Sequence, residues 1–201
     1  MEPVDLALVL ALDGSASVRY DEFNLIANGM GAALREPAVI TGLTHGPLRA
    51  SLVALLLWSS IGDQDVLVDW TRIDSPEAAR AFADAVENVP RTVRAGGTAL
   101  GEALAASHRL LTRAPAQASR RVVDIAGDGR SNEGRPPAPE RDRMVSAGIT
   151  INGLCVLNEE PDLLETYTRE VIGGPGAFAL TCASYEDFAD AMRQKLLREI
   201  A

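Results

Sequence analysis

Residues 4–17 read VDLALVLALDGSAS, an almost continuous apolar run that turns abruptly into an acidic and hydroxyl-rich stretch. Apolar runs of this length are typical of strands buried on both faces of a parallel sheet. Asp13, Ser15 and Ser17 follow at alternate positions, so an extended backbone would direct their oxygen atoms to the same side. Hard oxygen ligands suit Mg²⁺, and the pattern predicts a metal site where the strand ends. The alternative is that Ser15 or Ser17 caps the next helix while Asp13 accepts from loop amides.

Apolar runs of strand length alternate with amphipathic helical patterns along the rest of the chain. We expect strands over residues 4–12, 50–59, 65–73, 121–126, 149–157 and 177–182. We expect helices over 20–34, 76–88, 98–111, 139–147, 161–172 and 185–200, with a loop at 37–47. The five-residue link between the second and third strands predicts an antiparallel hairpin at a sheet edge. The alternation predicts an α/β fold, with helices on both faces of a doubly wound, six-stranded, mostly parallel sheet. The length fits a single domain over residues 1–201.

Two further oxygen-bearing residues fall where they would join the candidate site. Asp128 follows the fourth expected strand, and Thr98 follows two glycines at a helix start. In a doubly wound sheet of order 3-2-1-4-5-6, strands one and four flank the point where ligands bind. Asp13 and Asp128 would repel each other there, and a bound cation would remove that cost. Taken singly, Asp128 is better explained as a turn residue, and Thr98 is better explained as a helix cap.

Taken together, these residues resemble the metal-ion-dependent adhesion site of von Willebrand factor type A domains. The resemblance covers essentially the whole chain, including the hairpin edge strand and the closing helix. It implies a divalent cation, Mg²⁺ or else Mn²⁺ or Ca²⁺, with one coordination position open to a partner's carboxylate or to water. Direct ligands would be Ser15, Ser17 and Thr98, with Asp13 and Asp128 acting directly or through water.

The resemblance also implies a biological role and leaves a conformational question open. The chain would be a protein-binding module and not an enzyme, with a protein partner that presents an Asp or Glu carboxylate. Related domains couple ligand binding to a shift of the last helix, and whether residues 185–200 move here stays open.

One position departs from the pattern. Gly127 stands where the family usually has threonine before the second aspartate. With the stretch VIGGPGAF at 171–178, this departure is similar to an uncharacterised bacterial group of such domains, whose members are usually exported. That similarity favours a periplasmic or secreted protein whose leader is absent from this sequence. The start Met1-Glu2-Pro3, without a basic segment, fits a cytoplasmic protein as well.

Composition excludes several other classes of function. Nineteen basic and 28 acidic residues give a net charge of −9, which disfavours nucleic acid and anionic lipid as partners. No stretch reaches the roughly 18 apolar residues needed to cross a membrane. The single lysine, Lys195, lies in a helical pattern near the end and suits neither a phosphate-binding loop nor a Schiff base. His45 and His108 have no spacing that fits zinc.

Some alternatives stay open at this stage. A Mg²⁺-dependent hydrolase or phosphatase could use the same site, although Asp13 has no second carboxylate two residues on. A metal-free interaction scaffold is the third possibility. Cys155 and Cys182 would lie on neighbouring strands, where a disulfide bond and two buried thiols are equally plausible. The loop residues after Asp128, Arg130, Asn132 and Glu133, could line a partner surface or simply be solvated.

Overall fold

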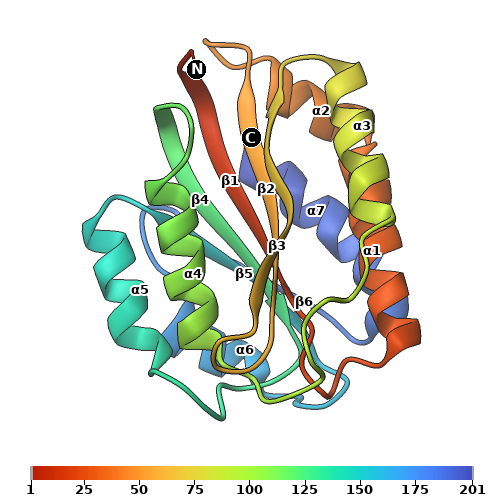
Figure 1. The fold of residues 1–201 in the computed structure, drawn as a ribbon, viewed down its shortest axis with the longest axis vertical. Helices are drawn as coiled ribbons and strands as arrows, with labels where there is room; N and C mark the ends of the chain where they lie inside the picture. The colour runs from red at the N-terminus through yellow and green to blue at the C-terminus, as the bar shows by residue number, and fades with distance from the viewer. Residues whose placement is uncertain (1, 201) are drawn as a thin grey trace.

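The computed structural model describes residues 2–200, which form one mixed sheet between two layers of helices (Figure 1). The strand order is β3-β2-β1-β4-β5-β6, with β3 antiparallel to β2 and the other pairs parallel. The predicted α/β architecture and strand order are therefore confirmed. The strands are β1 (Val4–Asp13), β2 (Ser51–Trp58), β3 (Gln64–Ile73), β4 (Ala118–Gly127), β5 (Thr150–Val156) and β6 (Ala179–Cys182).

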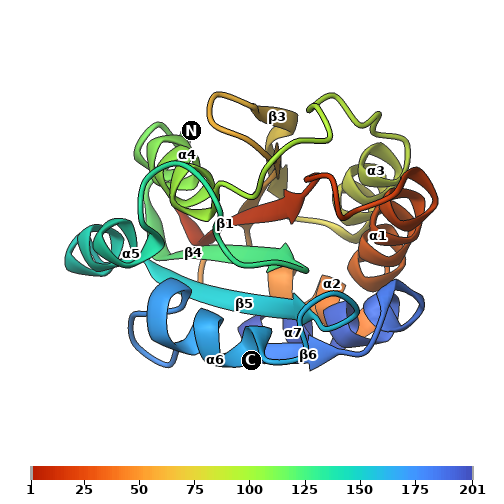
Figure 2. The same cartoon turned by 90° about the horizontal axis from the view of Figure 1, so that it is seen from below.

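The helices divide between the two faces of the sheet, as expected from right-handed crossovers. α1, α2, α3 and α7 pack on one face, and α4, α5 and α6 pack on the other (Figure 2). Their bounds are α1 (Tyr20–Leu34), α2 (Pro37–Thr44), α3 (Pro76–Glu87), α4 (Leu100–Thr112), α5 (Pro137–Ser146), α6 (Leu163–Thr166) and α7 (Phe188–Ile200).

Strand β1 lies at the centre of the core and shows why the long apolar run is needed. Its leucines, from Leu6 to Leu12 at every second position, face α1 and α7, whereas Ala7, Val9 and Ala11 face α4. Because both faces are covered, every residue from Leu6 to Asp13 is buried. Each fully buried leucine contributes about 1.5–3 kcal/mol relative to an exposed one. The strand is thus a fixed support for the residues that follow it.

Three elements differ from the sequence prediction. Residues 37–44 form α2 and not a loop, because Val39, Ile40 and Leu43 bury an apolar side while Pro37 occupies the first turn. The expected helix over 161–172 is only α6 followed by a π-helical segment, Tyr167–Val171. Likewise, the last helix begins with a 3₁₀ turn, Tyr185–Asp187, before α7.

The two cysteines are free thiols, on opposite faces of the sheet. Cys182 is aligned with Val156 of β5, and both side chains face the same side of the sheet. Cys155, the residue before Val156, faces the other side. A disulfide bond would require one strand to turn over, so the free-thiol alternative holds. Burial raises the pKa of both thiols to about 12. Within residues 2–200, no helix is long and apolar enough to cross a membrane.

Candidate metal site

The loop after β1 brings one carboxylate and two hydroxyls together at the carboxyl edge of the sheet. The Ser15 N–H donates to Asp13 Oδ1 at 2.7 Å, which folds the loop back over the strand end. The Ser15 and Ser17 hydroxyl oxygens lie 3.1 Å apart. The Ser17 hydroxyl donates to Asp128 Oδ1 at 2.6 Å, across 111 residues of sequence. Asp13, Ser15, Ser17 and Asp128 therefore meet where β1 and β4 end side by side (Figure 2).

Thr98 joins this group from the loop that precedes α4. Its N–H donates to the Asn132 side-chain oxygen at 2.8 Å, and its carbonyl accepts from the Asn132 N–H at 3.0 Å. Its hydroxyl oxygen lies 3.7 Å from the point that a Cβ at Gly129 would occupy. Thr98 is thus held against the turn that carries Asp128, and the structure gathers all five predicted residues.

The helix-cap alternatives are not borne out, although Asp13 does accept from a loop amide, the Ser15 N–H. The N-cap of α1 is Arg19, not Ser15 or Ser17, and the N-cap of α4 is Ala99, not Thr98. The hydroxyls of the two serines contact each other and Asp128 instead. Their position is therefore not explained by the start of a helix.

The two carboxylates of the site are buried and incompletely hydrogen-bonded. Asp13 and Asp128 are both buried, and the Oδ2 atom of each has no hydrogen-bond partner among the described residues. Burial, and secondly the charge of Asp128, raise the pKa of Asp13 to about 7. Burial also raises the pKa of Asp128, while the Ser17 hydroxyl opposes this. Two adjacent buried carboxylates with unpaired oxygens are costly unless a cation neutralises them.

The donor set fits a small, hard cation. Two carboxylates and three hydroxyls offer only oxygen, which Mg²⁺ and Ca²⁺ prefer. This set of five ligands contains only two charged groups. Across residues 2–200, no cluster of three or more His, Cys, Asp or Glu side chains could hold a metal.

Arg91 anchors the loop that carries the serines, and sequence reasoning did not find it. Its guanidinium donates to the carbonyl oxygens of Val18 at 2.6 Å, Gly14 at 2.6 Å and Ser15 at 2.8 Å. Arginine suits this task because its planar fork carries several donors in fixed directions. Arg91 lies in the connection between α3 and α4, where no sequence motif marks it.

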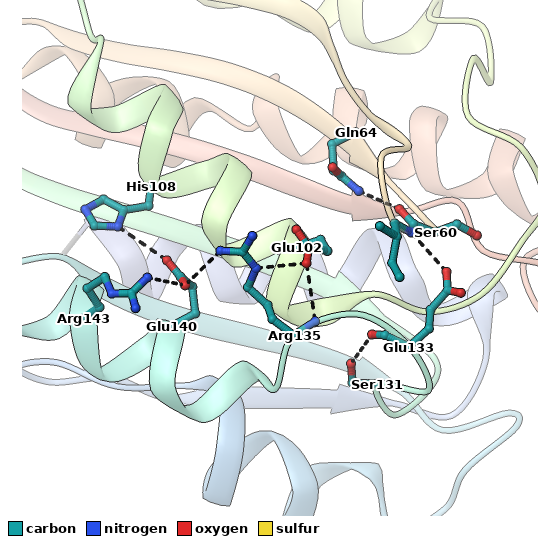
Figure 3. A network of polar contacts seen from close by, with 10 residues as sticks. Ser60, Gln64, Glu102, His108, Ser131, Glu133, Arg135, Glu140 and Arg143 are labelled. Atoms are coloured by element: carbon teal, nitrogen blue, oxygen red, sulfur yellow. Dashed lines mark hydrogen bonds and ion pairs between the residues drawn. The ribbon is translucent and has the colours of Figure 1, made fainter.

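The loop from Asp128 to α5 is tied to its neighbours by a polar network (Figure 3). Glu133 accepts from the Ile61 N–H at 3.1 Å, and Arg135 donates to Glu102 of α4 at 2.9 Å. Arg135 also contacts Glu140 of α5. Asn132 and Glu133, considered above as partner-surface residues, also hold neighbouring loops: Asn132 bonds to Thr98, and Glu133 bonds to Ile61.

These observations can be set beside known proteins. Residues 3–201 match a family described as "Protein of unknown function (DUF1194)". The chain belongs to the DUF1194 family. No curated protein matches the chain.

Solved structures place this DUF1194 chain among von Willebrand factor type A folds. A von Willebrand factor type A protein from Catenulispora acidiphila is 19% identical, with a TM-score of 0.65 over 96% of this chain and 42% of that one. Proximal thread matrix protein 1 from the mussel byssus, described with a zinc occupied MIDAS motif, is 15% identical, with a TM-score of 0.66 over 98% and 48%. The pilus adhesin SpaC from Lactobacillus rhamnosus GG is 14% identical, with a TM-score of 0.66 over 98% and 30%.

At these identities the similarity establishes the fold alone. The DUF1194 chain spans less than half of the length of each of these three chains. The fold is nevertheless one that a matrix protein and an adhesin share.

Proposed function

We propose that this DUF1194 chain binds a divalent cation and uses it to hold a protein partner through an Asp or Glu carboxylate of that partner. The observation that carries the proposal is the pair of buried carboxylates, Asp13 and Asp128, whose Oδ2 atoms have no partner within residues 2–200. Two buried carboxylate charges without a nearby positive charge destabilise a folded protein by roughly several kcal/mol. A site built around them is explained if it holds a positive charge.

Each residue would have a defined part in holding Mg²⁺ or a similar cation. Asp13 and Asp128 would provide the charge, and three hydroxyls would provide neutral oxygens: those of Ser15, Ser17 and Thr98. A bound cation would supply positive charge to which a partner's carboxylate binds by charge-assisted contact. Two carboxylates just neutralise a divalent ion, so the net charge of the loaded site does not repel a third carboxylate, which can bind directly to the cation. The hydrogen bonds of Arg91 and Asn132 would keep the loops in place before the cation arrives.

The surroundings of the site favour binding over catalysis. The single lysine, Lys195, is fully buried and pairs with Asp124 in the sheet, so it cannot balance a phosphoryl group at Asp13. The mussel matrix protein with a zinc occupied MIDAS motif and the pilus adhesin share the fold, which supports a role in protein interaction. Hydrolase chemistry has no comparable supporting observation.

The proposal can be tested with Mn²⁺ and acetate, which stand in for the cation and the partner's carboxylate. Electron paramagnetic resonance would measure Mn²⁺ binding to the wild type and to Asp13→Ala. Acetate added to the loaded protein is expected to lower the water-proton relaxation that bound Mn²⁺ causes. Absence of Mn²⁺ binding, or binding unaffected by Asp13→Ala, would contradict the proposal. Hydrolysis of a generic phosphate ester that requires Asp13 would favour the enzyme instead.

A further inference from the structure

Gly127, the last residue of β4, borders a small space that it shares with Asp13 and Tyr167. A Cβ at Gly127 would lie 2.9 Å from Asp13 Oδ2 and 2.9 Å from the Tyr167 hydroxyl oxygen. Both distances are shorter than ordinary van der Waals contact, so glycine leaves room for a phenol beside the carboxylate. A threonine at this position would collide with Tyr167 as it stands.

A second glycine makes room for the same side chain. Gly153 lies on β5, next to β4, and a Cβ there would lie 2.8 Å from Cδ1 of the Tyr167 ring. Tyr167 therefore crosses two adjacent strands at positions without side chains, and its hydroxyl reaches the end of β1. The residue also begins the π-helical segment Tyr167–Val171, and such segments are frequent at functional sites.

The two polar atoms that border this space both lack a partner. Tyr167 is fully buried, and its hydroxyl makes no hydrogen bond within the part of the chain that the structure describes. The same holds for Asp13 Oδ2. A buried polar group left unpaired costs about 1–3 kcal/mol, and native proteins rarely leave one so. A donor and an acceptor beside one space can satisfy each other directly or through one water.

We propose that Tyr167 is a positioning residue of the candidate metal site, whose hydroxyl donates to Asp13 Oδ2 and fixes how that carboxylate meets a cation. Asp13 Oδ1 already accepts from the Ser15 N–H. With Tyr167 on the other oxygen, both ends of the carboxylate have a defined direction. The inference rests on the proposed function. Glycine at position 127 provides no hydroxyl, and Tyr167, the first residue of the π-helical segment, would provide one in its place.

The test compares Tyr167→Phe with the wild type by titration with Mg²⁺ and with Mn²⁺. The phenylalanine keeps the ring in the core and removes only the hydroxyl. We expect the Kd for the cation to rise about tenfold, the lower end of what such supporting contacts contribute. We expect the melting temperature in EDTA to fall only slightly, because one hydrogen bond to Asp13 is lost while the ring stays packed in the core. Tyr20→Phe is the matched control, since Tyr20 is 74% exposed.

Two further readouts separate a positioning role from simple packing. Added Mg²⁺ should change the tyrosine ultraviolet absorbance less in Tyr167→Phe than in the wild type and in Tyr20→Phe; the change that remains comes from Tyr185, whose hydroxyl lies beside Asp128. Gly153→Ala, whose Cβ would meet the Tyr167 ring and no atom of the candidate site, should weaken binding in the wild type by displacing the phenol, and much less in a Tyr167→Phe background. Additive effects of the two changes would overturn the inference.

The outcomes also distinguish this inference from the proposed function. If Asp128→Ala abolishes cation binding while Tyr167→Phe binds with the wild-type Kd, the role of Tyr167 is overturned and the proposed function stands. If Tyr167→Phe lowers the melting temperature in EDTA and leaves the Kd unchanged, its role is packing alone, which also overturns the inference. If the wild type binds no cation, both fail.

Discussion

Asp13 is a fully buried residue whose negative charge is costly when no cation is bound. Its pKa is about 7 in the folded state and about 3.8 in the unfolded chain. The folded state therefore holds the proton more tightly than the unfolded chain does. The protonated Asp13 carboxyl stabilises the folded state fully below about pH 4, and this stabilisation is lost as the pH rises through about 7.

This shift predicts a pH-dependent difference between the wild type and Asp13→Asn in EDTA. Asparagine cannot ionise, so the melting temperature of the variant should rise relative to the wild type between about pH 5 and pH 8. Saturating Mg²⁺ should remove the difference at pH 8 or reverse it, because the ionised form then has its cation. An equal gap between the two proteins at both pH values would contradict the buried, high-pKa carboxyl.

The sequence alone identified the candidate metal ligands but not the residues that hold them in place. Asp13, Ser15 and Ser17 form a local pattern, and Asp128 and Thr98 stand at strand and helix ends, which a reader of the sequence can find. Arg91 and Asn132 approach from distant loops and Tyr167 from the π-helical segment, and their contacts depend on the tertiary fold. The one visible signal for Tyr167 was the glycine at position 127.

Helix α7 is fastened to the sheet by a buried charge pair. Lys195 is fully buried and forms an ion pair with Asp124 of β4, which is also buried. The pair lies within the apolar face that includes Met192 and Leu196 of the same helix. A buried ion is tolerated only while its partner is present, so the pair fixes how the helix docks.

Removing one member of this ion pair is expected to destabilise the protein strongly. Replacing both members with apolar residues is expected to destabilise it only mildly. Lys195→Met should lower the free energy of unfolding by about 3–5 kcal/mol, because Asp124 is left as an unpaired buried charge. Lys195→Met combined with Asp124→Leu should recover most of that loss. Denaturant unfolding measures both. A double variant no more stable than Lys195→Met would show that the charge pair is not the reason for the loss.

Among the elements, long periodic segments were predictable and short ones were not. The run that became β1 and the stripe that became α1 have clear apolar periods and were found with nearly correct bounds. Helix α2 has eight residues with β-branched and glycine positions, and tertiary packing of Val39 and Leu43 stabilises it. The π-helical segment Tyr167–Val171 has no sequence period of its own and depends on its packing against β5.

For the molecule as a whole, the sheet topology connects residues far apart in sequence into one site. β1 and β4 lie side by side only because the strand order reverses between them, and that reversal opens the edge where the five oxygen-bearing side chains meet. The alternating pattern was enough to predict this fold, and the comparisons agree with it. Export from the cytoplasm and the single-domain boundary stay predictions.

The most direct test of the account is the melting temperature in EDTA and in excess Mg²⁺, for the wild type and for Asp128→Ala. A cation that binds only the folded state, at about a hundred times its Kd, stabilises by about 2.7 kcal/mol. For a chain of this size that corresponds to about 5–10 °C. The account predicts such a rise for the wild type and none for Asp128→Ala. No rise in the wild type, or an equal rise in both proteins, would contradict a metal site at Asp13 and Asp128.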